Sequence, residues 1–403
     1  MAHNNTVFAQ LLKLLPRHEF ETLARQHHHG ARLRSTSRWS QFVAMTLAQL
    51  AGRASLRDVV SNLGAQSAKL YHLGAARVTR SSLARLNATQ PHSLYEQLAG
   101  RLLHQCQCRA PRHGFRFKNT LYSLDASTID LCLSVFPWAR FRQTKGAVKL
   151  HVGLDHDGLL PAFLTITDGK TADITAARAL RRPKASIVVM DRGYTDYAWY
   201  HRLHTQGLFF VTRLRKRACY RVTERRPVRK AQGLTSDQTI ELNGAKAGNC
   251  PIRLRRIGFR DPATGQHYAF LTNHFGLAAA TIAQIYKARW QIDLFFKWIK
   301  QNLKIKTFLG TSRNAVMTQI WIAVCVYLLL AYLNFVSKIS SSLKQIIRLL
   351  QLNLFERRDL LALLRGAPPR ASRLTTPNQP ALRLNIHGTA VYEHKHFRNH
   401  VID

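Results

Sequence analysis

Residues 282–303, IAQIYKARWQIDLFFKWIKQNL, are the stretch on which the fold prediction rests. The stretch contains no Gly or Pro and its apolar residues recur every three or four positions, so the sequence predicts one long helix. Five polar residues are spaced by three, four, four and three positions and therefore share one face: Tyr286, Arg289, Asp293, Lys297 and Lys300. On this face Asp293 is surrounded by cations, and it is the only acidic residue between Asp261 and Glu356.

Two interpretations of this helix face remain open at this point. It could be a solvated stripe in which Asp293 pairs with Arg289 or Lys297 at helical spacing. Alternatively, Asp293 could be a carboxylate that binds a metal ion, with the neighbouring cations binding nucleic-acid phosphates. The rest of the chain has to decide between them.

The composition predicts a polyanionic partner. The 403 residues include 60 Lys and Arg against 21 Asp and Glu, a formal charge of +39 that is spread along the chain. Such a charge repels itself in a compact protein, and nucleic acid is the partner that best compensates it. The membrane alternative rests on residues 320–336, which are 17 residues long, contain Asn334 and are better explained as a buried core helix. Six scattered cysteines suit a reducing compartment, so we expect a cytoplasmic protein without a membrane anchor.

Hydrophobic periodicity divides the chain into five parts. Residues 1–117 are Arg-rich with helical spacing and Gly breaks, which suits a DNA-binding domain but also a plain helical bundle. From residue 118 to 213, alternating and fully apolar runs predict three meandering strands, then helix, strand, helix, strand, an α/β order with a mixed sheet. Residues 214–275 predict a β-rich insertion, residues 276–338 return to helices, and residues 339–403 form a basic tail.

Two further acids are notable for their positions. Asp125 lies inside the first predicted strand, and Asp191 directly follows the apolar strand at 186–190. In α/β sheets, sites are built at the carboxyl ends of such strands. Each acid taken alone could be a structural ion pair in so basic a protein. An acid on the first strand, one after the fourth and one on a helix beyond an insertion together form the layout of a ribonuclease H-like metal site.

Three segments resemble the DDE transposases of bacterial insertion sequences, specifically the insertion-sequence-four group. They are LYSLDASTID at 121–130, VVMDRGYTDY at 188–197, and the pattern Tyr286-x2-Arg289-x3-Asp293-x6-Lys300. The family pattern reads Tyr-x2-Arg-x3-Glu-x6-Lys, so all three spacings match while Asp293 stands where the family has Glu. The matches span residues 118–335, and residues 37–59 also resemble the N-terminal region of these transposases.

The resemblance implies a specific active site. Asp125, Asp191 and Asp293 would be the catalytic acids, holding two divalent ions, Mg²⁺ with Mn²⁺ as a substitute. Phosphodiester cleavage and joining put charge on the attacking and leaving oxygens, and hard carboxylate oxygens suit the ions that stabilise both. The residues expected to contact DNA are Tyr286, Arg289, Lys297, Lys300, Arg192 and Trp290.

We therefore predict an α/β protein with a ribonuclease H-like mixed-sheet catalytic core, whose first part is residues 118–213 and whose final part is residues 276–338. A β-rich insertion separates these two parts, and an N-terminal helical domain precedes them. Its predicted function is metal-dependent cleavage at element ends and transfer of the 3′-hydroxyl ends into target DNA. The partners would be double-stranded DNA, as terminal repeats and target, and a second copy of the chain when two ends are bound. The alternatives are a ribonuclease H-like hydrolytic nuclease and a catalytically weakened DNA-binding repressor.

Overall fold

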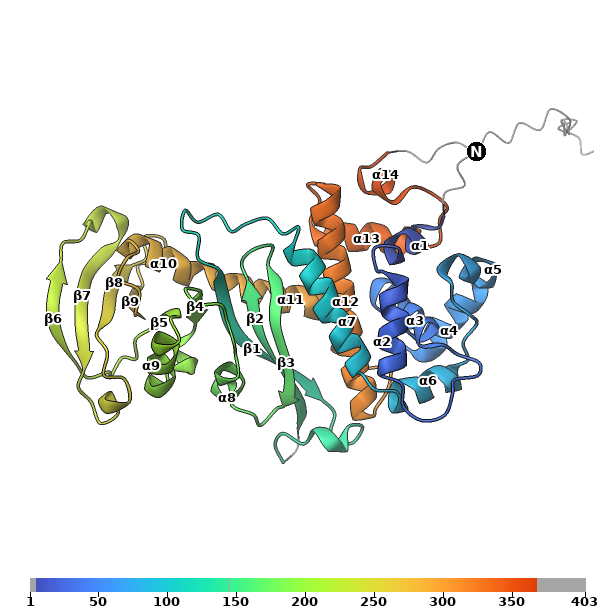
Figure 1. Ribbon diagram of the computed structural model, residues 1–403, viewed down its shortest axis with the longest axis horizontal. Coiled ribbons are helices and arrows are strands. Elements are labelled where there is room, and N and C mark those ends of the chain that lie inside the picture. The colour runs from blue at the N-terminus through green and yellow to red at the C-terminus, as the bar shows by residue number, and fades with distance from the viewer. Residues whose placement is uncertain (1–4, 144, 368–403) are drawn as a thin grey trace, which may run out of the picture. The chain divides into compact units, whose positions relative to one another are not determined.

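The computed structural model, which describes residues 5–143 and 145–367, contains one nine-stranded sheet, which runs from β6 at the left of Figure 1 to β3 near the middle. The strand order is β3-β2-β1-β4-β5-β9-β8-β7-β6. The strands are β1 (Leu121–Leu131), β2 (Gly146–Asp155), β3 (Leu160–Asp168), β4 (Ile187–Met190), β5 (Phe209–Arg213), β6 (Tyr220–Arg226), β7 (Leu234–Leu242), β8 (Leu254–Arg260) and β9 (His267–Thr272).

The first five strands have the ribonuclease H-like topology that the sequence predicts. Strands β1, β2 and β3 form an antiparallel meander, while β4 and β5 run parallel to β1. The connections to these parallel strands carry α8 (Asp173–Arg178) and α9 (Tyr197–Thr205). All four residues of β4 are buried, as expected for a short apolar strand at the centre of a sheet. The predicted mixed α/β core is confirmed.

The β-rich insertion continues the same sheet. Strand β9 pairs antiparallel with β5, placing Val211 opposite Thr272, and β8, β7 and β6 follow outward in an antiparallel series. The sequence predicts that residues 214–275 are rich in strands, but the pattern of a strand does not specify which strand lies beside it. The insertion therefore extends the catalytic sheet instead of forming a sheet of its own.

Helices cover both faces of this sheet, and the alternation of side chains along each strand decides which residue meets which layer. Val188 and Met190 of β4 pack in one cluster with α9, whereas Ile187 and Val189 pack in another with α10 (Ala279–Ala288). On β1, Leu121 belongs to the α10 cluster. Asp125 has the same parity as Leu121, so it faces the side of the sheet covered by α10 and α11 (Trp290–Asn302).

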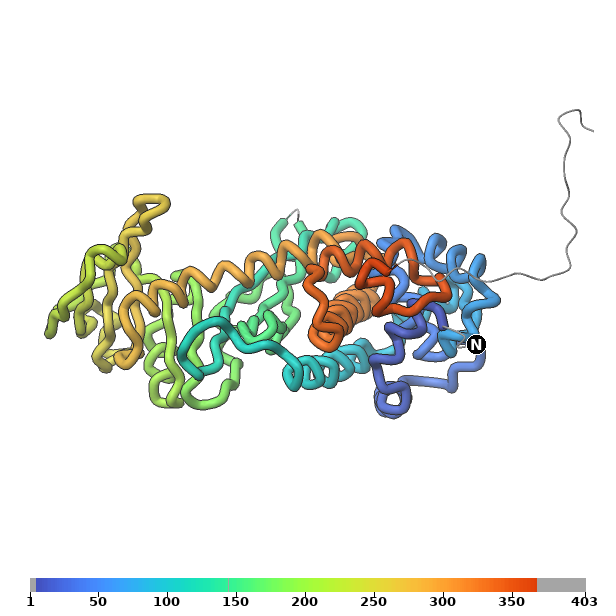
Figure 2. The backbone as a smooth tube through the Cα atoms, turned by 90° about the horizontal axis from the view of Figure 1, so that it is seen from above, coloured from blue at the N-terminus to red at the C-terminus, as the bar shows by residue number. Residues whose placement is uncertain are grey.

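The prediction of a single helix over residues 282–303 is wrong at one residue, because the stretch is divided between α10 and α11. Arg289 separates the two helices but keeps helical dihedral angles, φ −50° and ψ −32°. Its amide donates to the carbonyl of Tyr286, three residues back, so the regular bonding to the fourth residue is interrupted there. Figure 2 shows α10 and α11 following each other as an almost continuous rod.

The N-terminal part is helical, as predicted. A Ser-x-x-acid cap begins one of its helices, where Ser55 Oγ accepts from the Asp58 amide at 3.1 Å. The helices are α1 (Val7–Leu12), α2 (Arg17–Gln26), α3 (Arg38–Leu50), α4 (Leu56–Ala65), α5 (Ser67–Leu70), α6 (Arg80–Thr89) and α7 (Ser93–Gln107).

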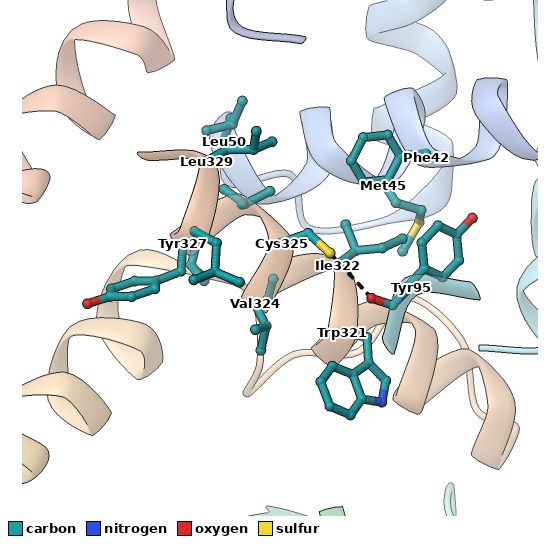
Figure 3. Packing of buried hydrophobic residues seen from close by; sticks show 14 of the residues in the cluster. Phe42, Met45, Leu50, Tyr95, Trp321, Ile322, Val324, Cys325, Tyr327 and Leu329 are labelled. Atoms are coloured by element: carbon teal, nitrogen blue, oxygen red, sulfur yellow. Dashed lines mark hydrogen bonds between the residues drawn. The ribbon is translucent and has the colours of Figure 1, made fainter. Parts of the chain in front are cut away.

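Helix α12 (Arg313–Ser337) is the central core helix of this part (Figure 3). It is long and apolar enough to cross a membrane by composition alone, but 78% of its most apolar window is buried inside the protein. Cys325 Sγ donates to the carbonyl of Tyr95 on α7, and Cys106 of α7 donates to the carbonyl of Leu328. The prediction that residues 320–336 form a buried core helix is confirmed.

Part of the predicted C-terminal tail is folded onto the N-terminal helices. Residues 339–367 include α13 (Leu343–Asn353) and α14 (Leu360–Leu364). The Val7 amide donates to the carbonyl of Glu356 at 3.0 Å, and the rings of Phe8 and Phe355 meet edge to face. Residues 368–403 of the predicted tail lie outside the described residues.

Candidate active site

The register of two parallel strands places Asp125 and Asp191 at adjacent positions. Pairing between β1 and β4 runs from Leu121 opposite Ile187 to Leu124 opposite Met190. Asp125 and Asp191 are the next residue on each strand, at the carboxyl end of β4. Although β1 continues to Leu131, this parallel register brings two acids that are far apart in the sequence to adjacent positions.

The turn after β4 fixes the Asp191 carboxylate. Asp191 caps the short 3₁₀ turn Arg192–Tyr194, and its Oδ1 accepts from the Gly193 amide at 2.7 Å. A Cβ at position 193 would lie 2.8 Å from that same oxygen, which is closer than carbon and oxygen tolerate. Glycine at 193 therefore lets the backbone approach the carboxylate.

Helix α11 brings the third acid to the same edge. Arg289, at the junction of α10 and α11, lies between two carboxylates: its Nη1 is 3.6 Å from Asp125 Oδ2 and its Nη2 is 3.3 Å from Asp293 Oδ2. The pair between Arg289 and Asp293 is the one expected of a solvated stripe, yet the Arg289 side chain is only 15% exposed and also meets β1. The helix face is thus part of an acidic cluster.

The electrostatics of Asp125 reflect this crowding. Burial raises the pKa of Asp125 to about 6, and the nearby Asp293 and Asp191 carboxylates add to the rise. The Ala126 amide, which donates to Asp125 Oδ1 at 2.8 Å, and the Arg289 guanidinium act in the opposite direction without cancelling it. The raised pKa of Asp125 is therefore mainly an effect of burial, and the two neighbouring acids add to it.

The residues predicted to contact DNA have different surroundings. Lys300 points back to the sheet, where its Nζ donates to the carbonyl of Thr128 at 3.0 Å, and burial lowers its pKa. Tyr286 is half-buried and packs on Phe270, with ring centroids 4.8 Å apart. Three others are exposed: Trp290, Lys297 and Arg192.

Comparison with known proteins agrees with this geometry. The family model described as "Transposase DDE domain" matches residues 116–329, and a domain of unknown function, DUF4372, matches residues 3–76. A protein of Sinorhizobium fredii named as transposase y4zB is 33% identical over 290 residues, 71% of this chain and 80% of that protein. The chain belongs to the DDE transposases of insertion sequences.

Two further proteins resemble this transposase. The protein named as the transposase for insertion sequence element IS5377 of Geobacillus stearothermophilus is 30% identical over 277 residues, 67% of this chain and 71% of that protein. A solved synaptic complex of the piggyBac transposase with hairpin DNA covers 89% of this chain and 78% of its own, with 11% identity and a TM-score of 0.45. This last likeness is too weak to indicate function.

The predicted function, a DDE-type transposase, is therefore confirmed. The matching family domain spans β1 to α12 and includes all three predicted acids. Neither the hydrolytic nuclease nor the DNA-binding repressor is favoured by these matches. The insertion-sequence-four group within the family stays a prediction, as do the roles of individual site residues.

DDE transposases use divalent metal ions, and the donor atoms here suit such ions. All three side chains offer hard carboxylate oxygens, and Asp293 Oδ2 is buried without a hydrogen-bond donor among the described residues. Within residues 5–143 and 145–367, no three acidic, His or Cys side chains already form a group that could hold an ion. The guanidinium of Arg289 contacts two of the three acids instead.

A second group of polar residues lies beside these acids and was not predicted from the sequence. Tyr194 is buried, and its pKa is raised by burial and by Asp125, Asp173 and Asp191. Asp173, in the first turn of α8, forms an ion pair with Lys149 at 3.0 Å. Tyr194 lies in the quoted segment VVMDRGYTDY, three residues after Asp191. This short separation was the signal in the sequence that Tyr194 would lie near the acids. Nothing in the local sequence indicated that Asp173 would lie near it.

Proposed function

We propose that this transposase cuts DNA at the ends of an insertion sequence of the insertion-sequence-four group and joins the 3′-hydroxyl ends to target DNA. Asp125, Asp191 and Asp293 would hold the two divalent ions. One observation carries the proposal: a strand, a strand end and a helix from distant parts of the sequence each direct one carboxylate to the same edge of the sheet. A structural role does not require three mutually repelling carboxylates there.

The position of each acid decides which metal ion it would bind. Two divalent ions, when bound, activate the attacking oxygen and stabilise the leaving oxygen. Asp125 is the next residue after the segment of β1 that pairs with β4, and it shares Arg289 with Asp293, so it would contact both ions, with each of the other acids serving one. The Gly193 amide keeps Asp191 oriented, and the ribonuclease H-like sheet keeps Asp125 and Asp191 in register.

The cations of α11 would bind DNA phosphates beside the cut. Lys297 is exposed, Arg289 contacts two of the acids, and Lys300 reaches the carbonyl of Thr128 on the strand that carries Asp125, so all three would make charge-assisted contacts to phosphate oxygens. Trp290, 61% exposed, and Tyr286 could stack on an unpaired base or donate to a phosphate. Arg192 follows Asp191 and is exposed on the turn that carries it.

The remaining parts of the proposal concern the partners. The N-terminal helices of residues 1–117 would bind the terminal repeats, since this part is basic and the catalytic sheet lies elsewhere in the chain. Holding two ends for one reaction requires two active sites, so the active form would be a homodimer on DNA. The place of action would be the bacterial cytoplasm, at the nucleoid.

A strand-transfer assay tests the proposal. The full chain is incubated with pre-cleaved element ends, supercoiled target and Mg²⁺ or Mn²⁺, beside Asp125→Asn and a matched control, Asp130→Asn, which changes an exposed acid on the same strand. We expect joined products with the wild type and with Asp130→Asn, and none with Asp125→Asn. Cleavage without joining would instead indicate a nuclease, and binding without either would indicate a repressor.

A further inference from the structure

Arg289 holds a position that the proposed metal ions also need. Its guanidinium contacts Oδ2 of Asp125 and Oδ2 of Asp293, from the junction between α10 and α11. A Mg²⁺ ion binds carboxylate oxygens at about 2.0–2.1 Å. An ion on either oxygen would therefore compete with the guanidinium for the same atom and repel its charge.

The contacts of Arg289 are long and incomplete, which makes them exchangeable. At 3.6 and 3.3 Å, neither nitrogen donates a hydrogen bond to its carboxylate within the described part of the chain. Arg289 Nε and Asp293 Oδ2 are both buried and have no hydrogen-bond partner among the described residues. A guanidinium forms stronger, bidentate bonds with phosphate when the geometry allows it.

We propose that Arg289 couples the loading of metal to the arrival of DNA. In the free protein its guanidinium neutralises Asp125 and Asp293 and keeps divalent cations out. A DNA phosphate beside the site draws the guanidinium away and frees both carboxylates for the ions. This inference rests on the proposed role of the three acids as metal ligands.

Thermodynamic linkage gives the proposal a measurable form. If DNA removes the competitor of the metal, DNA and metal each raise the affinity of the protein for the other by the same factor. Such couplings are typically worth about 5- to 150-fold. A protein without the Arg289 guanidinium should bind metal well without DNA and should lose most of this coupling.

The experiment measures Mn²⁺ binding to the full chain by electron paramagnetic resonance of free Mn²⁺, without DNA and with a saturating duplex whose own binding is subtracted. Arg289→Ala is compared with the wild type and with Lys287→Ala, which removes an exposed cation from the same stretch of helix. We expect Arg289→Ala to bind Mn²⁺ about tenfold more tightly than the wild type without DNA, by analogy with such couplings. Lys287→Ala should behave like the wild type. DNA should raise the Mn²⁺ affinity of the wild type and of Lys287→Ala, and it should raise that of Arg289→Ala much less.

Two results would overturn the inference in different ways. Equal or weaker Mn²⁺ binding by Arg289→Ala without DNA would show that the guanidinium does not compete with metal, while leaving the three acids as ligands. If Asp125→Asn binds Mn²⁺ as tightly as the wild type, with and without DNA, the proposed metal site itself is wrong and the inference fails with it. Thermal melts in EDTA check that each variant is folded before it is titrated.

Discussion

The two halves of the sheet each contain a carboxylate beside an arginine, and the two ion pairs are built differently. In the outer half, Arg255 of β8 binds both oxygens of Asp237 on β7 at 2.9 and 2.7 Å. Its remaining nitrogen donates to three backbone carbonyls, those of His274, Phe275 and Leu277. In the inner half, Arg289 stands 3.6 and 3.3 Å from two acids and leaves polar atoms unpaired within the described residues.

This difference separates a structural ion pair from one available for chemistry. Bidentate pairing with every donor used offsets much of the cost of burying two charges, and it leaves no atom free for a ligand. The cluster around Arg289 keeps unsatisfied oxygens and a raised carboxyl pKa instead. Perturbed and incompletely paired groups of this kind occur preferentially at functional sites.

The largest expected effect is on catalysis at the inner pair. Asp125→Asn removes one charged metal ligand, and losing several kcal/mol of transition-state stabilisation corresponds to a decrease of roughly 1,000-fold in strand transfer. Asp237→Asn should leave the rate per folded molecule unchanged. The measurement is the single-turnover rate of strand transfer, corrected for the folded fraction of each variant. Equal losses of rate in both variants would contradict the distinction between the two pairs.

The next effect is on stability, and here the order of the two sites is reversed. Asp237→Asn leaves the buried Arg255 without its counter-ion, which should lower the free energy of unfolding by about 3 kcal/mol. Asp125→Asn removes a repelled carboxylate and should not destabilise the metal-free protein. Urea denaturation of both variants in EDTA measures this, and a stable Asp237→Asn variant would contradict the structural role of the outer pair.

A third prediction concerns the shorter acid at position 293. The family has Glu here, and Asp is shorter by one C–C bond, about 1.5 Å, against a required metal–oxygen distance of about 2.0–2.1 Å. Asp293→Glu should therefore keep or raise strand transfer in Mg²⁺, by up to about tenfold, since one tenfold step corresponds to 1.36 kcal/mol. A clear loss of strand transfer in this variant, with wild-type folding, would argue against Asp293 as the third catalytic acid.

A fourth prediction concerns Asp155, a buried acid of β2 that makes no ion pair in the described part of the chain. Burial raises its pKa to about 6 from an ordinary 3.8, although the Asp157 amide donates a hydrogen bond to Asp155 Oδ1 that acts in the opposite direction. The folded state thus binds this proton more tightly than the unfolded state. The stabilisation it contributes is present below pH 3.8 and is lost as the pH rises through 6.

Replacing Asp155 removes this pH-dependent loss. Asp155→Asn should be more stable than the wild type by about 1–2 kcal/mol above pH 6, and the difference should shrink toward pH 4. Denaturation midpoints between pH 4 and 8 provide the measurement, with Asp130→Asn as an exposed control. A constant difference across this range would mean that Asp155 is not the titrating group.

The sequence was sufficient for much of the fold because the relevant signals are local. The apolar run at 186–190 predicts a buried strand, and the alternation around Asp125 predicts another. Each signal depends on residues within one element, whose periodicity reflects its own burial. Tyr286, Arg289, Asp293 and Lys300 also lie within one stretch of chain, so their spacing could be recognised from the sequence alone.

By itself, then, the sequence determined the element order, the mixed α/β core, the membership of the transposase family and the three candidate acids. Only the tertiary structure decided that the β-rich insertion joins the catalytic sheet through β9 and that Arg289 lies between Asp125 and Asp293. It also decided that Tyr194 would lie buried beside these acids. The physical reason is that strand neighbours and ion-pair partners depend on contacts between residues far apart in the chain, which local periodicity does not encode.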